Sequence, residues 1–231
     1  MKDSEKKIQE LEETIQNLRS DLSSEQSKNA YTYNRLFELQ EAVSCITSAP
    51  VTDDGESLVI DTETTGLNAF ENEILQISII NTKGDVLFDS YFAPVALNVG
   101  LKWEEAERIN HISPEMVEHS PRLCSRISQI NAITTKAKKI IGYNIDFDRQ
   151  FLQANGIVFA SNAEFVDVMV PFAEFFGEWN DYYRNYTWQK LGVAAAYCGY
   201  DWSSHENAHN SLGDCFATLH VYNKLKELGK L

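Results

Sequence analysis

The fold is decided by one stretch of the chain, Ser57-Leu58-Val59-Ile60-Asp61-Thr62-Glu63-Thr64-Thr65-Gly66-Leu67. It opens with a short apolar run, rich in β-branched side chains, which predicts a buried strand. The run ends in Asp61 and Glu63, which are separated by one residue. Because side chains alternate along a strand, both carboxylates are expected on the same side of the sheet.

This carboxylate pair is a candidate metal site. Two like charges that close repel each other, and carboxylate oxygens are hard ligands that suit Mg²⁺ or Mn²⁺. Thr64-Thr65-Gly66 is expected to turn the chain and to leave backbone amides free beside the carboxylates. A strand end with two solvated acids has the same pattern, so the pair alone leaves both interpretations open.

The composition predicts one sizeable folded domain with an added segment. The chain has 231 residues, of which 43% are hydrophobic and 23% are charged, enough for one core. No apolar run approaches the ~20 residues of a membrane-spanning helix, and the charged residues 1–7 do not resemble a signal peptide. The formal charge of −14 argues against a protein that coats long nucleic acids, but not against an enzyme that grips one strand end through metal ions.

The cysteines predict a cytoplasmic protein with reduced thiols. They are scattered and form no Cys-x-x-Cys pair, so we expect packing residues rather than a redox or metal site. The four positions are Cys45, Cys124, Cys198 and Cys215.

Residues 1–48 predict a coiled-coil helix that mediates homo-oligomerisation. Apolar residues alternate at spacings of three and four, as at the a and d positions of a heptad. They are Ile8, Leu11, Ile15, Leu18 and Leu22, and then Leu36, Leu39, Val43 and Ile46. Asn29 falls at an a position, where Asn often favours a parallel dimer. A single amphipathic helix lying on the globular domain is the alternative, but the charged outer faces favour self-association.

Residues 49–56 contain Pro50 and Gly55 and predict a linker. From residue 57 to residue 231 the pattern predicts one α/β domain, in which a mixed sheet is flanked by helices. After the first strand we expect strands at residues 73–80, 86–92, 139–144 and 165–168, with the first three strands antiparallel. Helices are expected at residues 104–109, 114–119, 123–137, 147–155, 171–176, 188–198 and 211–228.

Three further residues stand where an active site would form. Asp148 lies where a buried strand passes into a helix, the usual edge for α/β sites. Asp146 is close enough to compete with it as a ligand but is better placed to cap the helix. Asp214 is expected in the first turn of the last helix. Since five positions differ by about 140° on a helix, His209 is placed on the approach to that helix.

These residues occur in a recognisable order. Asp61-x-Glu63, the Asn-x-x-Phe-Asp pattern ending at Asp148, and His209-x-x-x-x-Asp214 together resemble the motifs of DEDDh-type 3′–5′ exonucleases, a family that includes the epsilon proofreading subunit of bacterial replicative DNA polymerase. The resemblance covers about residues 57 to 228. Residues 109–117 are similar to a further motif of the family, although epsilon proteins often carry His-Gly where this chain has Asn110-His111.

The resemblance implies a ribonuclease H-like fold and a metal-dependent hydrolase that releases nucleoside monophosphates from the 3′ end of single-stranded DNA. It implies two Mg²⁺ or Mn²⁺ ions and a polymerase or repair partner. The implied roles are metal binding by Asp61, Glu63, Asp148 and Asp214, general base for His209, and substrate contact for Thr64, Leu67 and Asn110. An exoribonuclease, or a non-catalytic nucleic-acid-binding module on a coiled coil, are the alternatives.

One aromatic stretch carries no assigned role. For Phe172, Phe175 and Phe176 we expect core packing, and for the aromatic residues of 179–188 a partly exposed loop. Stacking on a single strand is the alternative. The histidines outside the motif, His111, His119, His205 and His220, are expected to be structural or solvated.

Deleting residues 1–48 is expected to give a monomer that keeps the activity of the remaining domain, because the uninterrupted a/d register from Ile8 to Ile46 is the predicted self-association surface. Light scattering on the full and shortened chains measures the change. An oligomer of unchanged size after the deletion would contradict the prediction.

Overall fold

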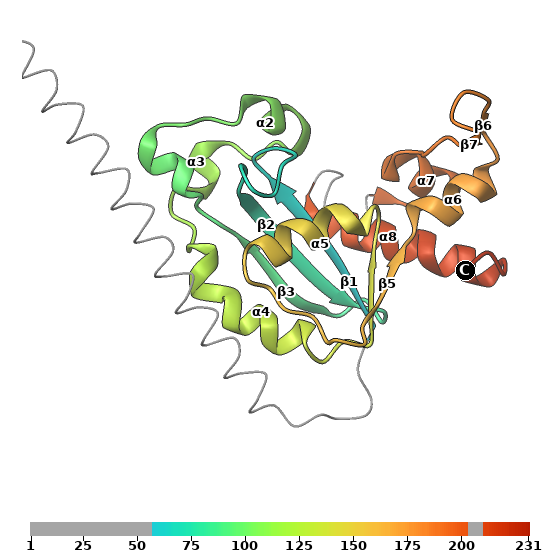
Figure 1. The fold of residues 1–231 in the computed structure, drawn as a ribbon, viewed down its shortest axis with the longest axis horizontal. Coiled ribbons are helices and arrows are strands. Elements are labelled where there is room, and N and C mark those ends of the chain that lie inside the picture. Colours follow the sequence, from blue (N-terminus) through green and yellow to red (C-terminus); the bar gives the residue numbers. More distant parts are fainter. Residues whose placement is uncertain (1–56, 203–209) are drawn as a thin grey trace, which may run out of the picture.

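The computed structural model describes residues 57–202 and 210–231 (Figure 1). The predicted coiled-coil helix at residues 1–48, the linker at residues 49–56 and His209 lie outside the described residues, and they stay predictions. Within the described residues, no helix is both long and apolar enough to cross a membrane.

A five-stranded sheet forms the centre of the domain, in the order β3-β2-β1-β4-β5. Its strands are β1 (Ser57–Thr64), β2 (Ile74–Asn81), β3 (Val86–Tyr91), β4 (Lys139–Gly142) and β5 (Glu164–Asp167). The first three strands pair antiparallel, and β1, β4 and β5 pair parallel. This arrangement confirms the predicted mixed sheet of the ribonuclease H-like type.

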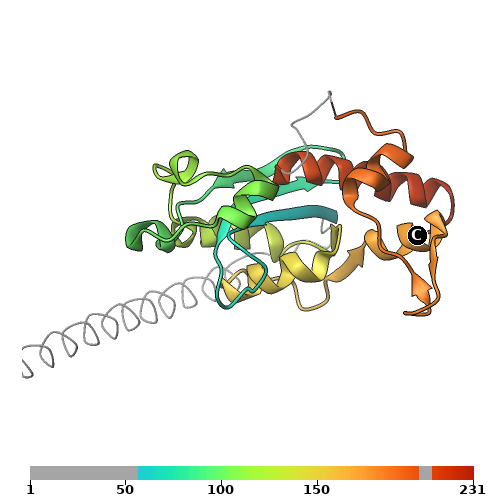
Figure 2. The ribbon, with the colours of Figure 1, turned by 90° about the horizontal axis from the view of Figure 1, so that it is seen from above.

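Helices cover both faces of this sheet. They are α2 (Glu104–Asn110), α3 (Pro114–Val117), α4 (Ile127–Thr134), α5 (Ile145–Ala154), α6 (Met169–Phe176), α7 (Leu191–Tyr197) and α8 (Ser211–Glu227). The structure also contains two 3-10 turns, η1 (Val95–Val99) and η2 (Leu123–Arg126). A small hairpin is formed by β6 (Trp179–Asn180) and β7 (Asn185–Tyr186). Viewed from above, α5 and α8 lie on opposite sides of β1 (Figure 2).

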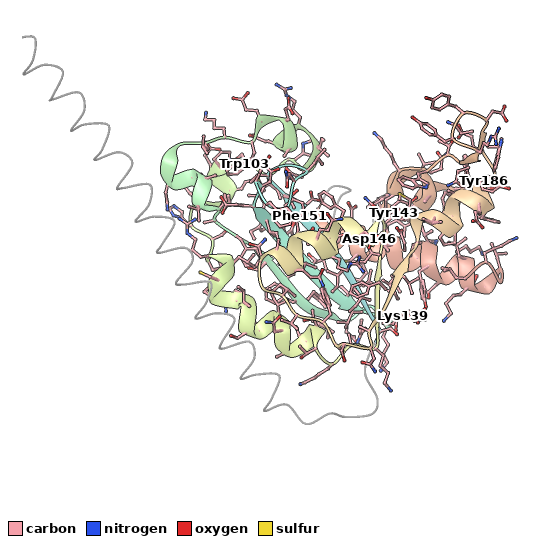
Figure 3. The ribbon with its side chains drawn as sticks, in the orientation of Figure 1. Trp103, Lys139, Tyr143, Asp146, Phe151 and Tyr186 are labelled. Atoms are coloured by element: carbon pink, nitrogen blue, oxygen red, sulfur yellow. The ribbon has the colours of Figure 1, made fainter. Side chains whose placement is uncertain are left out.

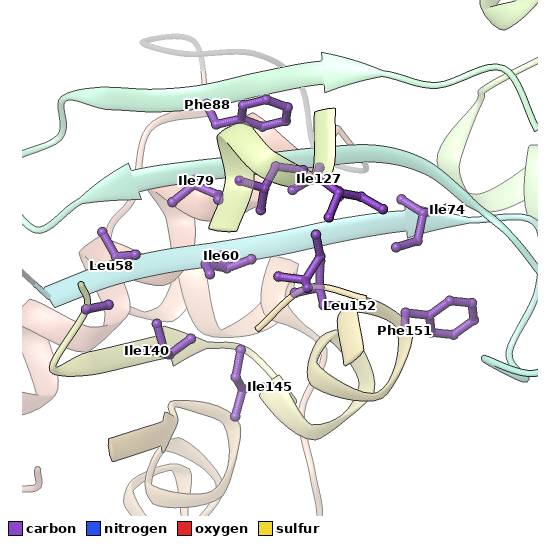
Figure 4. Packing of buried hydrophobic residues seen from close by; sticks show 14 of the residues in the cluster. Leu58, Ile60, Ile74, Ile79, Phe88, Ile127, Ile140, Ile145, Phe151 and Leu152 are labelled. Carbon is purple, nitrogen blue, oxygen red and sulfur yellow. The ribbon is translucent and has the colours of Figure 1, made fainter. Parts of the chain in front are cut away.

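Alternate residues of β1 enter two separate cores. Leu58 and Ile60 pack with side chains of α4 and α5 (Figure 4), whereas Val59 packs with side chains of α6, α7 and α8. Burial of these apolar side chains is the main driving force that holds the helices on the sheet. Since the alternation continues along the strand, Thr62 falls on the α5 side, and Asp61 and Glu63 fall on the α8 side.

The last helix is deeply buried. Its side chains Leu212, Phe216, Leu219 and Tyr222 all pack in the core on the α8 side of the sheet. Small residues occupy the deepest positions, and Cys215 and Ala217 are fully buried. Cys215 thus behaves as the predicted packing residue, whereas Cys124 is exposed.

Several helix boundaries differ from the sequence prediction; for example, α6 begins at Met169 and α7 begins at Leu191. The helix expected at residues 123–137 is a 3-10 turn followed by α4, which ends at Thr134. There the Thr134 hydroxyl donates to the carbonyl of Val158 (2.6 Å) and so ties the helix end to a neighbouring loop. The helix expected to begin at residue 147 begins at Ile145.

The earlier start of α5 corrects the role expected for Asp146. Asn144 takes the left-handed conformation, with φ of 64°, at the position that precedes the helix; Asn tolerates this region better than most residues. Asp146 therefore lies inside the first turn and pairs with Arg149 (3.0 Å) instead of capping the helix. Gly142 permits the tight junction, since a Cβ there would lie 2.6 Å from the Ile145 side chain.

Candidate active site

The turn after β1 is a closed loop. The Thr65 amide donates to the Glu73 carbonyl (2.8 Å), and the Glu73 amide donates to the Thr65 hydroxyl (2.9 Å). The Glu73 carboxylate in turn accepts hydrogen bonds from the amides of Val95 and Ala96. The Thr65 amide, expected to be free beside the carboxylates, is therefore engaged within the protein.

Three of the predicted metal ligands come together at the end of β1. Oxygen atoms of Asp61, Glu63 and Asp214 all lie within 4.8 Å of one another, and each residue is half-buried. Asp61 and Glu63 come from the strand, and Asp214 comes from the first turn of α8. That turn is fixed by Asn210, whose side chain accepts a hydrogen bond from the Leu212 amide (3.0 Å), as a helix N-cap does.

The fourth predicted ligand, Asp148, lies on the α5 side of β1. It is buried, with 3% of its surface exposed, and the Thr62 hydroxyl donates to its Oδ1 (2.7 Å). A carboxylate offers a second oxygen, so this hydrogen bond does not use up its capacity as a ligand. The sequence motifs assign no role to Thr62, although side-chain alternation along the strand predicts that it lies on the face opposite the carboxylate pair.

Burial raises the pKa of the site carboxyls, and repulsion among them adds to this effect at Asp61 and Glu63. Burial, followed by the charges of Asp148, Asp214 and Glu63, raises the pKa of Asp61 well above its usual value. Burial and the charges of Asp214 and Asp148 raise the pKa of Glu63 to about 8. Burial also raises the pKa of Asp148 to about 7, against the hydrogen bond from Thr62, which lowers it. Such a group of acids keeps protons at neutral pH unless a cation replaces them.

Asn110 links α2 to this group. Its amide donates to the Thr64 carbonyl (3.1 Å), and its side-chain oxygen accepts from the Ile112 amide (3.1 Å). Its side chain also hydrogen-bonds to Glu63 and lowers the pKa of that carboxyl. The structure thus gives Asn110, predicted as a substrate contact, a clear role in positioning Glu63.

An open cleft of about 500 Å³ lies beside the carboxylates. Its lining residues are Thr62, Glu63, Thr64, Thr65, Gly66, Leu67, Asn72, Glu105, Ala106, Ile109, Asn110 and Phe147. Thr64 is buried and donates to the Gly66 carbonyl (2.6 Å), whereas Leu67 is 86% exposed and Ile109 is 60% exposed. The cleft therefore has an acidic end and an apolar rim, of which Ile109 and Phe147 were not predicted.

The other predicted side chains lie apart from this site. Asp167 accepts hydrogen bonds from the amides of Asn144 and Met169 (both 2.9 Å), so its carboxylate holds the starts of α5 and α6. His119 is exposed beside Glu118, and a ring nitrogen of His220 lies 3.0 Å from the Cys198 carbonyl oxygen. These histidines are thus solvated or structural, as expected.

A mixed sheet with acidic residues from β1, α5 and α8 near the end of β1 is typical of the ribonuclease H-like fold. Residues 58–222 match the model of a family described as exonuclease. The chain therefore belongs to this exonuclease family.

Individual relatives agree with this assignment. The chain is 31% identical to DNA polymerase III subunit epsilon of Treponema pallidum (strain Nichols) over 96 residues, which are 41% of this chain and 43% of the relative. The fold is similar to that of a zinc-bound complex of E. coli exonuclease I with single-stranded DNA, with a TM-score of 0.60 and 17% identity over 76% of this chain and 41% of that chain. A second exonuclease I structure gives a TM-score of 0.61 and 18% identity over 75% and 41%. The chain thus spans less than half the length of these proteins.

Without metal ions, the domain is expected to lose stability as the pH rises towards about 8. The raised pKa values mean that the folded protein binds protons that the unfolded chain has already released. The free energy of unfolding therefore falls with increasing pH between the ordinary carboxyl value and the raised one. Thermal unfolding in a chelator at about pH 6 and about pH 8.5 measures this effect, and we expect a difference of at least about 3 °C.

Glu63→Gln is the matched variant for this measurement. It removes a carboxyl whose pKa is raised to about 8, so its midpoint should change less between the two pH values than that of the wild type. Adding Mg²⁺ at the higher pH should stabilise the wild type more than the variant. Identical pH slopes for the two proteins would contradict the proton uptake described here.

Proposed function

We propose that this chain hydrolyses phosphodiester bonds at the 3′ end of single-stranded DNA and releases nucleoside monophosphates. The observation that carries the proposal is the group of Asp61, Glu63 and Asp214, whose oxygens lie within 4.8 Å of one another and of which Glu63 lines an open cleft. Ordinary phosphodiesters resist hydrolysis because the attacking oxygen and the phosphate repel each other, and such a group can hold the cations that relieve this repulsion.

The donor set suits Mg²⁺ or Mn²⁺. All donors are carboxylate oxygens, which these ions prefer. Oxygens that share one Mg²⁺ at about 2.1 Å lie up to about 4.2 Å apart, which is compatible with the spacing in this group. Asp61, Glu63, Asp148 and Asp214 would hold two ions, which when bound supply a nucleophile at neutral pH and neutralise charge on the phosphate and the leaving oxygen.

The protein's own side chains keep these ligands in place. Thr62 fixes one oxygen of Asp148, and Asn110 fixes Glu63 against the end of α2. The N-cap at Asn210 sets the first turn of α8, which carries Asp214. These hydrogen bonds hold the carboxylates in position before a substrate arrives, so that little reorganisation is needed during the reaction.

The cleft supports binding of a terminal nucleotide. Its exposed apolar rim at Leu67 and Ile109 offers a surface for a base, and Thr64 lies between this rim and the carboxylates. The DNA preference rests on the relatives, since one is a DNA polymerase III subunit and another was solved with single-stranded DNA. An exoribonuclease is the second candidate, and cleavage of matched DNA and RNA oligonucleotides with Mg²⁺ or Mn²⁺ distinguishes the two.

Four further features belong to the proposal. His209, which directly precedes Asn210 in the sequence, is the proposed general base that takes a proton from the attacking water. Residues 1–48 are the proposed homo-oligomerisation helix, and a DNA polymerase is the proposed partner by similarity to the epsilon subunit. A cytoplasmic location remains part of the same proposal.

Replacing one carboxylate of the metal site should abolish cleavage. Asp61→Asn, Asp148→Asn and Asp214→Asn are each expected to lower kcat at least about a thousandfold, because each removes a ligand of the ions that stabilise the transition state. Asp146→Asn is the matched control, since Asp146 lies two residues from Asp148 but pairs with Arg149 at the surface. Its activity should stay within a few-fold of wild type. If Asp146→Asn were the inactive variant and Asp148→Asn the active one, the ligand assignment would be wrong.

A general base should affect turnover more than metal binding. His209→Ala is therefore expected to lower the single-turnover cleavage rate by about 10²–10⁴-fold with little change in metal affinity. The neutral imidazole is the competent form, so wild-type activity should fall as the pH drops through the pKa of His209. The variant should lose most of this acidic limb.

His205→Ala serves as the control, because it changes another histidine of the same segment. Calorimetric titration with metal and single-turnover cleavage, on variants first shown to be folded, separate the two roles. Unchanged cleavage in folded His209→Ala would mean that another group accepts the proton.

A further inference from the structure

The aromatic stretch divides into a buried part and an exposed part. Phe172 is fully buried, and Phe175 and Phe176 pack against the same core, as predicted. Residues 179–188, which we call the aromatic hairpin, contain the strands β6 and β7. Four of its rings are at least half exposed: Trp179, Tyr182, Tyr183 and Trp188.

The hairpin holds these rings in a fixed arrangement. The Asn180 side chain accepts hydrogen bonds from the amides of Tyr182 (3.0 Å) and Tyr183 (3.1 Å). The rings of Tyr182 and Tyr183 meet edge to face, with centroids 4.8 Å apart. Trp179 contacts Tyr186 in the same way at 5.2 Å. Because the rings are already positioned, a ligand that binds them orders few additional groups.

One hydrogen bond connects the base of the hairpin to the active-site helix. The Tyr143 hydroxyl donates to the Gln189 carbonyl (2.8 Å), and Tyr143 directly precedes Asn144, the residue at the start of α5. Figure 3 shows Tyr143 and Asp146 at the end of α5 that is nearer Tyr186 of the hairpin. Figure 1 shows α2 and the hairpin on the same side of the domain, with α5 between them. A single-stranded nucleic acid that extends from the cleft along α5 therefore runs towards the hairpin.

The composition of the hairpin suits a single strand, whose bases can stack on flat rings. Between Trp179 and Trp188 there is no aliphatic side chain of the Leu, Ile, Val or Met type, so flat rings stand among polar groups. Residues 178–190 contain two acidic and two basic side chains, in contrast to the net charge of −14 of the whole chain. Arg184 lies exposed at the tip, where a guanidinium can contact phosphates or stack on bases.

We propose that the aromatic hairpin binds the single strand on the 5′ side of the scissile bond and stacks its bases on Tyr182 and Tyr183. This inference rests on the proposed function, which sets the 3′ end in the cleft. The hairpin then forms a subsite that only the longer oligonucleotides reach. Stacking of this kind tolerates any base, because every base has a flat face.

The test is a ladder of labelled oligothymidylates, from a dinucleotide to about twelve nucleotides, bound to the full chain with Ca²⁺ in place of Mg²⁺. The double variant Tyr182→Ala/Tyr183→Ala should weaken binding of the longest oligonucleotide about 5- to 100-fold and leave the dinucleotide unchanged. The matched variant Tyr182→Phe/Tyr183→Phe keeps both rings and should bind every length within about twofold of wild type.

Two outcomes would overturn the inference. Equal weakening at every length would mean that the hairpin only supports the active site. Unchanged binding at every length would mean that the exposed rings do not bind the single strand and serve another partner, such as a protein. Cleavage of the dinucleotide by the wild type with Mg²⁺ tests the proposed function by itself, so a failure there is distinguished from a failure of the hairpin subsite.

Discussion

Side-chain alternation along β1 is the constraint on which the site depends. The apolar part of the strand alternates between two cores, so its register is fixed by burial on both faces. The same register carries Asp61 and Glu63 to the α8 side and Thr62 to the α5 side. A slip of one residue would exchange the two sides and separate the acids from Asp214. The cores thus hold the geometry of the carboxylate group as well as the fold.

Burial brings the carboxylates together and makes their full ionisation costly. Carboxylates that are shielded from water and close to one another disfavour full ionisation, which is why their pKa values are raised. Thr62 and Asn110 partly offset this cost by donating hydrogen bonds to the charged forms. The metal-free protein therefore stores electrostatic strain that a divalent ion relieves, which links stability to metal binding.

Most of the scaffold was predictable from the sequence, because its signals are local. Apolar runs gave the strands, and the motif spacing gave the acidic residues of β1, α5 and α8. The contacts of Thr62 and Asn110 were not predictable, since they join segments far apart in the chain. The start of α5 was missed because the left-handed conformation of Asn144 lets the helix begin two residues early. The aromatic hairpin was missed because its strands are only two residues long.

The loop between β1 and β2 is held closed by hydrogen bonds of its own. Hydrogen bonds between Thr65 and Glu73 fix its base, and the Asn72 side chain accepts from the Asn68 amide within it. Leu67 therefore projects from a loop whose ordering cost was met during folding. If a nucleotide docks against Leu67 as proposed, binding there needs no folding of the loop, and the contact area and hydration of this surface set the residence time.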